Sequence, residues 1–157
     1  MQVAGKKVSL LSCDASSDGL TVAAGSALQG EDASIVYWDP RNPAAPLRKH
    51  NETHSDDITA VRFTRSGSEE ILLSASTDGL LCTTNPGEDD DDEAGLNVGN
   101  WGCSIAKAGW IEGGNGPKAW ASSDMETVSL WDAEVNMISV TKSIDFDICF
   151  SSIPYEN

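Results

Sequence analysis

The sequence predicts an all-β protein built from a sheet unit that is repeated three times. The first indication is a pair of Trp-Asp steps, Trp38-Asp39 and Trp131-Asp132, which each follow an apolar run and lie 93 residues apart. Thr84-Asn85 ends a similar run near the middle of that interval, so the repeat is 46 or 47 residues long. A fixed period of a few tens of residues indicates stacked structural units.

The expected strands follow the same period. Apolar and polar residues alternate from Ile58 to Phe63, which is typical of a half-buried strand. A shift of 47 residues forward, or of 50 residues back, meets comparable apolar positions at Ile105, Ala108 and Trp110, and at Val8, Leu11 and Cys13. A small apolar strand and a tight acidic turn come next in each unit, with the small strands at residues 20–25, 71–76 and 119–122.

Composition limits the function classes. The chain has 157 residues, enough for one domain, and its 10 basic against 25 acidic residues give a net charge of −15. Because this charge repels a phosphate backbone, we expect no nucleic-acid partner. The sequence has no apolar run of the roughly 20 residues that a membrane span needs, so we expect an intracellular protein, cytoplasmic, nuclear or both. The four cysteines lack zinc-type spacing and predict buried thiols, with a metal site or a disulfide as the alternatives.

The layout resembles the WD-repeat β-propeller family, in which each repeat forms a four-stranded blade. The stretches Glu52 to Phe63 and Ser74 to Leu80 are similar to the WD repeat-containing protein 89 group. The resemblance implies a partial propeller of about three four-stranded antiparallel blades. We expect the blades at residues 1–53, 54–100 and 101–143, with an acidic insertion at 87–100 and an irregular tail at 144–157.

The family pattern also implies a structural hydrogen-bond network. Asp78 is expected to hold its turn and to accept a hydrogen bond from His54, whose other ring nitrogen would meet Ser76. Trp38-Asp39 and Trp131-Asp132 are the expected repeat ends. The middle repeat departs from the pattern, since Thr84 and Asn85 stand where the family has Trp and Asp.

Ser, His and Asp are also the residue types of acyl transfer, so a propeller-based hydrolase is an alternative. A nucleophilic serine requires an exposed, strained turn such as Gly-x-Ser-x-Gly beside an oxyanion hole. Ser76 instead ends a strand of small residues. The sequence therefore favours a structural role, with no catalytic residues, no cofactor and no metal.

The acidic run Glu88 to Glu93 allows three interpretations. Six like charges repel one another and favour an extended, solvated segment. A contact with a basic partner and a metal site are the alternatives. A calcium loop would need ligands at alternating positions around a glycine, which the run lacks.

The predicted function is a non-catalytic scaffold that binds one or more proteins through loops of the propeller. Three blades do not close a ring, because propellers have 4 to 8. We therefore expect the chain to be part of a longer protein whose open blade edges pair with further blades or with another chain. The alternative is a truncated fragment with no independent activity.

Overall fold

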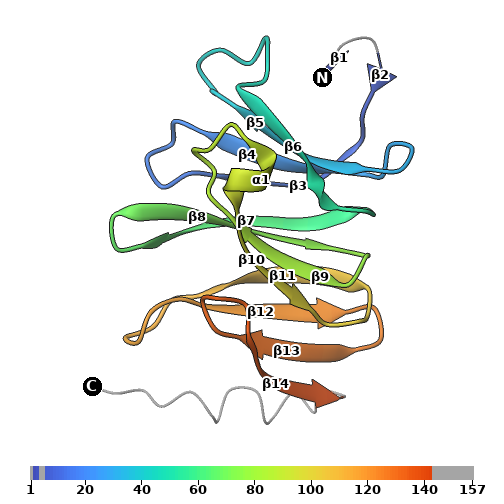
Figure 1. Cartoon of the computed structure of the whole chain (residues 1–157), viewed down its shortest axis with the longest axis vertical. Helices are drawn as coiled ribbons and strands as arrows, with labels where there is room; N and C mark the ends of the chain where they lie inside the picture. The colour runs from blue at the N-terminus through green and yellow to red at the C-terminus, as the bar shows by residue number, and fades with distance from the viewer. Residues whose placement is uncertain (1, 4–5, 143–157) are drawn as a thin grey trace.

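Each repeat folds into one four-stranded antiparallel sheet whose strands are neighbours in chain order (Figure 1). The computed structural model describes residues 2–3 and 6–142. We call the three sheets blade 1, blade 2 and blade 3. Blade 1 consists of β3 (Leu10–Ala15), β4 (Val22–Ser26), β5 (Ala33–Trp38) and β6 (Arg48–His54). Blade 2 consists of β7 (Ile58–Ser66), β8 (Glu69–Ser76), β9 (Leu80–Thr84) and β10 (Gly95–Asn100). Blade 3 consists of β11 (Ile105–Ile111), β12 (Lys118–Ser123), β13 (Thr127–Trp131) and β14 (Met137–Lys142). The predicted all-β fold of three four-stranded units is therefore confirmed.

Two short elements lie outside the blades. A two-stranded ladder joins β1 (Gln2–Val3) to β2 (Lys6–Lys7), and α1 (Asp91–Ala94) is a single helical turn. The described residues contain no helix that is both long and apolar enough to cross a membrane.

The first strands of the blades lie side by side, with β7 between β3 and β11 (Figure 1). The Ser12 hydroxyl of β3 donates to the carbonyl oxygen of Ile58 in β7 at 3.0 Å. The Thr59 hydroxyl of β7 donates in the same way to the carbonyl oxygen of Ile105 in β11 at 2.7 Å. The same type of contact therefore joins each blade to the next, one repeat apart.

The second strands are rich in small residues because both of their faces are covered. A Cβ atom at Gly25 in β4 would lie 2.4 Å from Cγ2 of Ile58 in the next blade, closer than real contacts allow. Ala23 and Ala24, which point to opposite faces of β4, are both buried. Small side chains at these positions let neighbouring blades approach closely.

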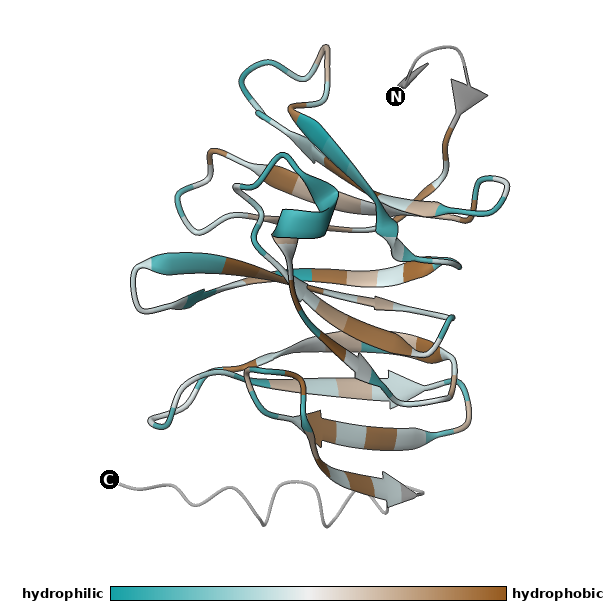
Figure 2. Ribbon diagram, in the orientation of Figure 1, coloured by the Kyte–Doolittle hydropathy of each residue, from teal (hydrophilic) through white to brown (hydrophobic). Residues whose placement is uncertain are grey.

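Apolar clusters fill the spaces between blades. Figure 2 shows hydrophobic residues mainly on the strands, whereas the loops and the outer strand β6 are largely hydrophilic. Between blades 1 and 2 the buried residues are Ala23, Ala33, Ile35, Tyr37, Ile58, Val61 and Leu72. Between blades 2 and 3 they are Ala60, Leu73, Ala75, Leu81, Ile105, Ala108, Ala119, Ala121, Trp131 and Val135. Burial of each large aliphatic side chain contributes about 1.5–3 kcal/mol, so these clusters stabilise the packing of one sheet on the next.

The structure corrects the interpretation of residues 87–100 as an insertion. Residues 95–100 form β10, the fourth strand of blade 2, paired with β9. Residues 91–93 of the acidic run lie in α1, so the run is not extended, although the side chains of Asp89, Asp90, Asp92 and Glu93 are exposed to solvent as expected. The Asp90 side chain caps this turn by accepting hydrogen bonds from the N–H groups of Asp92 and Glu93. Acidic residues are favourable at a helix N-terminus, which offsets part of their mutual repulsion.

The acidic run is also docked on blade 1. The Asp91 carboxylate accepts hydrogen bonds from the backbone N–H groups of Asn51 at 2.6 Å and Glu52 at 3.1 Å, both in β6. The Arg48 guanidinium contacts the Asp89 carboxylate at 2.8 Å. The run therefore ties blade 2 to the outer strand of blade 1.

The predicted buried thiols are only partly correct. Cys82 is buried, Cys103 is half-buried, and Cys13 is exposed. Cys13 pairs with Ala24 and so lies on the face of blade 1 that points away from blade 2. The tail expected at 144–157, with Cys149, lies outside the described residues.

Candidate functional site

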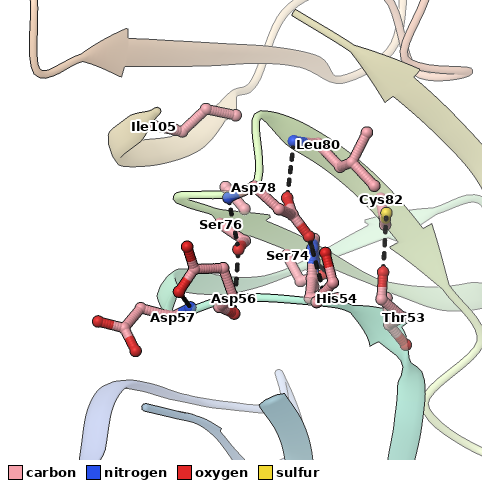
Figure 3. A network of polar contacts seen from close by, with 12 residues as sticks. Thr53, His54, Asp56, Asp57, Ser74, Ser76, Asp78, Leu80, Cys82 and Ile105 are labelled. Carbon is pink, nitrogen blue, oxygen red and sulfur yellow. Dashed lines mark hydrogen bonds and ion pairs between the residues drawn. The ribbon is translucent and has the colours of Figure 1, made fainter. Parts of the chain in front are cut away.

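The expected polar network joins blade 1 to blade 2 (Figure 3). His54 ends β6, Asp78 lies in the turn between β8 and β9, and Ser74 lies within β8. Nδ1 of His54 lies 3.1 Å from Oδ2 of Asp78, and Nε2 lies 2.8 Å from Oγ of Ser74. The side chain of His54 is fully buried and that of Asp78 is 7% exposed. Both ring nitrogens of this buried histidine are therefore paired.

The serine partner of His54 was predicted wrongly. Oγ of Ser76 donates instead to the carbonyl oxygen of Asp56 at 3.1 Å and accepts from the N–H of Asp78 at 3.1 Å. Ser74 and Ser76 point to the same face of β8, because side chains alternate along a strand. The His54 ring reaches the serine that lies farther from the turn. The sequence shows that both serines lie on that face, but it does not show how far the His54 ring extends between the two blades.

Asp78 organises its turn through both carboxylate oxygens. Oδ1 accepts from the N–H of Leu80 at 2.9 Å, and Oδ2 accepts from the N–H of Ser55 at 3.0 Å. Burial alone would raise the pKa of Asp78, but the hydrogen bond from His54, its charge and the two backbone N–H groups outweigh burial and lower the pKa. Gly79 has φ of +86°, a conformation that glycine adopts without strain.

This trio has the residue types of acyl transfer but not the access. Ser74 is completely buried, and its hydroxyl meets the His54 ring inside the space between blades. The arrangement can hold two blades in register, but it cannot present a nucleophile to a substrate. The neighbouring Cys82 thiol is equally inert, because burial raises its pKa to about 12.

The repeat ends occupy matching positions. Trp38, Thr84 and Trp131 are the last residues of β5, β9 and β13, paired with Val22, Leu72 and Ala119 of the second strands. Nε1 of Trp131 donates to Oγ of Ser129 at 2.7 Å. Among the described residues, the buried hydroxyl of Thr84 makes no hydrogen bond of standard geometry, although it lies close enough to the Tyr37 hydroxyl to lower the pKa of that group against the larger effect of burial.

The residue after each third strand closes the same kind of turn. Side-chain oxygens of Asp39, Asn85 and Asp132 each accept from the backbone N–H two residues later, at 2.9, 3.0 and 3.0 Å. Asp and Asn are both suited to this turn. Asn85 therefore preserves the turn geometry in the repeat that lacks the Trp-Asp pair.

A second histidine network links blade 1 to the acidic run, and sequence reasoning missed it. Nδ1 of His50 is 3.2 Å from the Tyr37 hydroxyl, and Nε2 is 2.9 Å from the carbonyl oxygen of Glu88. Burial raises the pKa of Tyr37. The alternation in β6, which places His50 and His54 on one face, was the available signal.

One end of the blades forms a continuous row of loops, which we call the acidic loop edge. It comprises residues 27–32, 55–57, 77–79, 101–104 and 124–126. Hydrogen bonds between loops hold the row together, from the N–H of Leu28 to the Asp57 carboxylate at 2.7 Å and from the N–H of Trp101 to the Gly79 carbonyl at 2.9 Å. These loops contain six Asp or Glu residues outside the buried Asp78 and no Lys or Arg.

Apolar side chains protrude from the acidic loop edge at both ends of the row. Leu28 is 38% exposed and Met125 is 77% exposed. No group of three or more His, Cys, Asp or Glu residues is placed to hold a metal ion within residues 2–3 and 6–142. The surface of the acidic loop edge is therefore acidic, with an exposed apolar side chain at each end.

Similarity to known proteins was found at the level of both sequence and fold. WD repeat-containing protein GTS1 of Arabidopsis thaliana is 39% identical over 101 residues, covering 64% of this chain and 25% of that protein. The WD repeat-containing protein 89 homolog of Dictyostelium discoideum is 34% identical over 86 residues, covering 55% of this chain and 23% of that protein. The chain thus spans about a quarter of the length of these curated relatives.

The blades also superpose on a solved propeller. The crystal structure of RRP9 WD40 repeats matches with a TM-score of 0.69 and 14% identity, covering 88% of this chain and 40% of that one. No family model matches the chain. Because sequence identity and the arrangement of the three blades lead separately to the same kind of protein, the chain belongs to the WD-repeat family of β-propeller proteins.

Proposed function

We propose that the chain is part of a non-catalytic scaffold that binds protein partners on the acidic loop edge. The observation that carries this proposal is the row of hydrogen bonds between neighbouring loops, two of which flank the buried His54–Asp78 pair in the middle of the row. Loops held in this way present their exposed side chains in fixed positions. Preorganised contacts favour binding, because less conformational entropy is lost on association.

The chemistry of the edge indicates the kind of partner. Its carboxylates and the net charge of −15 favour a basic protein surface and repel nucleic acid. Leu28 and Met125 supply apolar contact points between the acidic groups. Acidic groups would then guide encounter, and the apolar residues would contribute most of the retained affinity. The buried serine–histidine pair gives no support to a hydrolase.

Capture of partners from native cells with two matched variants tests this proposal. Leu28→Asp/Met125→Asp changes the acidic loop edge, whereas Leu20→Asp/Leu47→Asp makes the same chemical change at leucines that are 45% and 51% exposed at the opposite end of the blades. We expect the first variant to lose specific partners that the wild type and the second variant retain. Equal losses with both variants, or none with either, would exclude this edge as the binding surface.

The location in the cell is part of the same proposal. We place the protein inside the cell, in the cytoplasm, the nucleus or both, where its free Cys13, Cys82 and Cys103 thiols stay reduced. Fluorescence microscopy of the tagged natural protein checks this expectation.

A further inference from the structure

β10 is the edge strand of blade 2, and its outer backbone groups are open to pairing. It lies at the end of its sheet and pairs with β9 alone. The N–H of Trp101 donates to the carbonyl oxygen of Gly79, a bond that flanks a non-hydrogen-bonded pair at Asn100. The two kinds of pair alternate along an antiparallel ladder, so the pair at Val98 is also non-hydrogen-bonded. The N–H and C=O groups of Val98 and Asn100 therefore point away from β9.

This edge lacks the usual protection against pairing with another strand. Edge strands are commonly protected by charged residues, by proline or by a covering segment. β6, the outer strand of blade 1, is charged, and Asp91 of α1 accepts hydrogen bonds from two of its N–H groups. β10 contains no charged residue and no proline, and its Leu96 and Val98 side chains are 47% and 67% exposed. A register shift between Gly95 and Asn97 leaves residues 97–100 as the regular part of this open edge.

A hollow of about 240 Å³ adjoins the edge and is lined by residues of β6, α1, β9 and β10. Val98 pairs with Cys82, whose thiol donates to the Thr53 carbonyl oxygen of β6, so Val98 lies on the face of blade 2 that turns to blade 1. Glu52 of β6 and Asp92 of α1 line the hollow together with Val98, and none of the lining residues is a lysine or an arginine. The hollow therefore combines an apolar side chain with carboxylates.

Two of these carboxylates are available to a ligand. Asp91 uses its carboxylate on the N–H groups of β6. Glu52 and Asp92 are exposed, and within residues 2–3 and 6–142 neither makes an ion pair. A lysine or arginine side chain suits this hollow, because its apolar stem can lie on Val98 while its charged end stays with the carboxylates and water.

We propose that an extended, basic segment of a partner protein adds to β10 as a fifth strand of blade 2, with a lysine or arginine side chain in the hollow beside Glu52, Asp92 and Val98. In strand addition, backbone hydrogen bonds give affinity and pockets for side chains give specificity. A second copy of the chain suits this edge less well, because each copy carries a net charge of −15 and brings the same carboxylates. The inference is independent of the acidic loop edge, which contains none of these residues.

Nuclear magnetic resonance of the full chain with two synthetic peptides tests the proposal. The probe is a capped heptapeptide in which threonine and lysine alternate, with lysine at the second, fourth and sixth positions. The matched peptide carries N-methyl groups on its three central residues, which keeps the charge and blocks pairing along both of its edges. The probe should slow hydrogen exchange of the Val98 and Asn100 amides several-fold, and the N-methyl peptide should not. Equal effects of the two peptides, or no protection of these amides by either, would overturn the proposal.

Charge variants test the hollow. Glu52→Gln/Asp92→Asn should weaken binding of the probe several-fold. Glu69→Gln/Glu134→Gln removes the same number of charges from exposed positions elsewhere and should bind the probe like the wild type. Equal weakening in both variants would assign the binding to net charge and contradict the proposal.

Val98→Pro tests the backbone of the edge. Proline is tolerated on an edge strand where the lost N–H faced solvent, so this variant should fold but should lose protection of the Asn100 amide by the probe. Val98→Thr retains the N–H and should keep that protection. Should Val98→Pro fail to fold, the N-methyl peptide still separates strand pairing from charge attraction. A wild-type dimer in sedimentation that Val98→Pro dissociates would assign the edge to a second copy and refute the proposal.

Discussion

Nδ1 of His54 in blade 1 lies 3.1 Å from the Asp78 carboxylate in blade 2, and the two side chains are almost completely buried. The pair connects two sheets at the point where the chain passes from one to the other (Figure 3). A change in the interaction between the two residues should therefore change the free energy of unfolding of the protein.

Acid should destabilise the protein through Asp78. Folding lowers the pKa of this carboxyl group, so the unfolded chain takes up its proton first as the pH falls. The contribution is complete above the unfolded value of about 4 and is lost as the pH falls through the lower folded value. Urea denaturation from pH 7 to pH 2.5 should show that decline in the wild type, and a weaker decline, from a lower starting stability, in Asp78→Asn. Parallel curves for the two proteins would contradict the assignment.

Replacement of Ser74 tests whether this residue has a structural role as the hydrogen-bond partner of His54. Ser74→Ala leaves Nε2 of His54 buried without its partner, which should lower the free energy of unfolding by about 1–3 kcal/mol. Ser74→Thr retains a hydroxyl and should recover part of that loss. Chemical denaturation followed by tryptophan fluorescence measures both variants. Unchanged stability in Ser74→Ala would show that the hydrogen bond contributes nothing.

Thr84 offers a stabilising substitution. Its hydroxyl is buried and makes no hydrogen bond of standard geometry among the described residues, with only the nearby Tyr37 hydroxyl acting on it, so the native state carries a desolvation cost there. Valine has nearly the same shape without the hydroxyl, and Thr84→Val should raise the free energy of unfolding by about 1 kcal/mol. A rise in Tm checks this outcome. Thr84→Ser, which keeps a hydroxyl and removes a methyl group, is the control and should lower Tm.

Gly25 should not tolerate a methyl group. Its added Cβ would lie 2.4 Å from Ile58 of the next blade and 2.8 Å from the Ser12 hydroxyl. Gly25→Ala should therefore destabilise the protein by about 1–3 kcal/mol through overpacking. Gly113 has open space around the same position, so Gly113→Ala is the matched control, with little expected change. Equal denaturation midpoints for the two variants would refute close contact between blades 1 and 2.

Two aspartates of the acidic run should differ in importance. Asp91 accepts two backbone hydrogen bonds from β6, whereas Asp89, with a side chain 82% exposed, makes an ion pair with Arg48. Asp91→Ala should cost about 1–3 kcal/mol, because charge-assisted hydrogen bonds are stronger than neutral ones. Asp89→Ala should change stability by less than about 1 kcal/mol, as exposed ion pairs do. Limited proteolysis should cut residues 85–94 faster in Asp91→Ala than in the wild type or Asp89→Ala. Equal rates of cleavage in the three proteins would show that the acidic run is not held on blade 1.

Much of the fold was predictable because its signals are local. Alternation over Ile58 to Phe63, small residues in the second strands and Trp-Asp at two repeat ends each depend on a few adjacent residues. The acidic run was misread for the same reason. Its composition favours extension in isolation, but Asn51 and Glu52 of β6, about 40 residues earlier, supply the N–H groups that hold it.

The order of the amino acids alone established a sheet module with a period near 47 residues and a polar trio suited to architecture more than to chemistry. Folding in three dimensions decided that His54 meets Ser74 and not Ser76, that His50 joins Tyr37 to the acidic run, and that five loops form one acidic edge. The repeat can be recognised from residues that are close in the sequence. Each of these pairings depends instead on the position of one sheet relative to the next, which is set by packing between the blades.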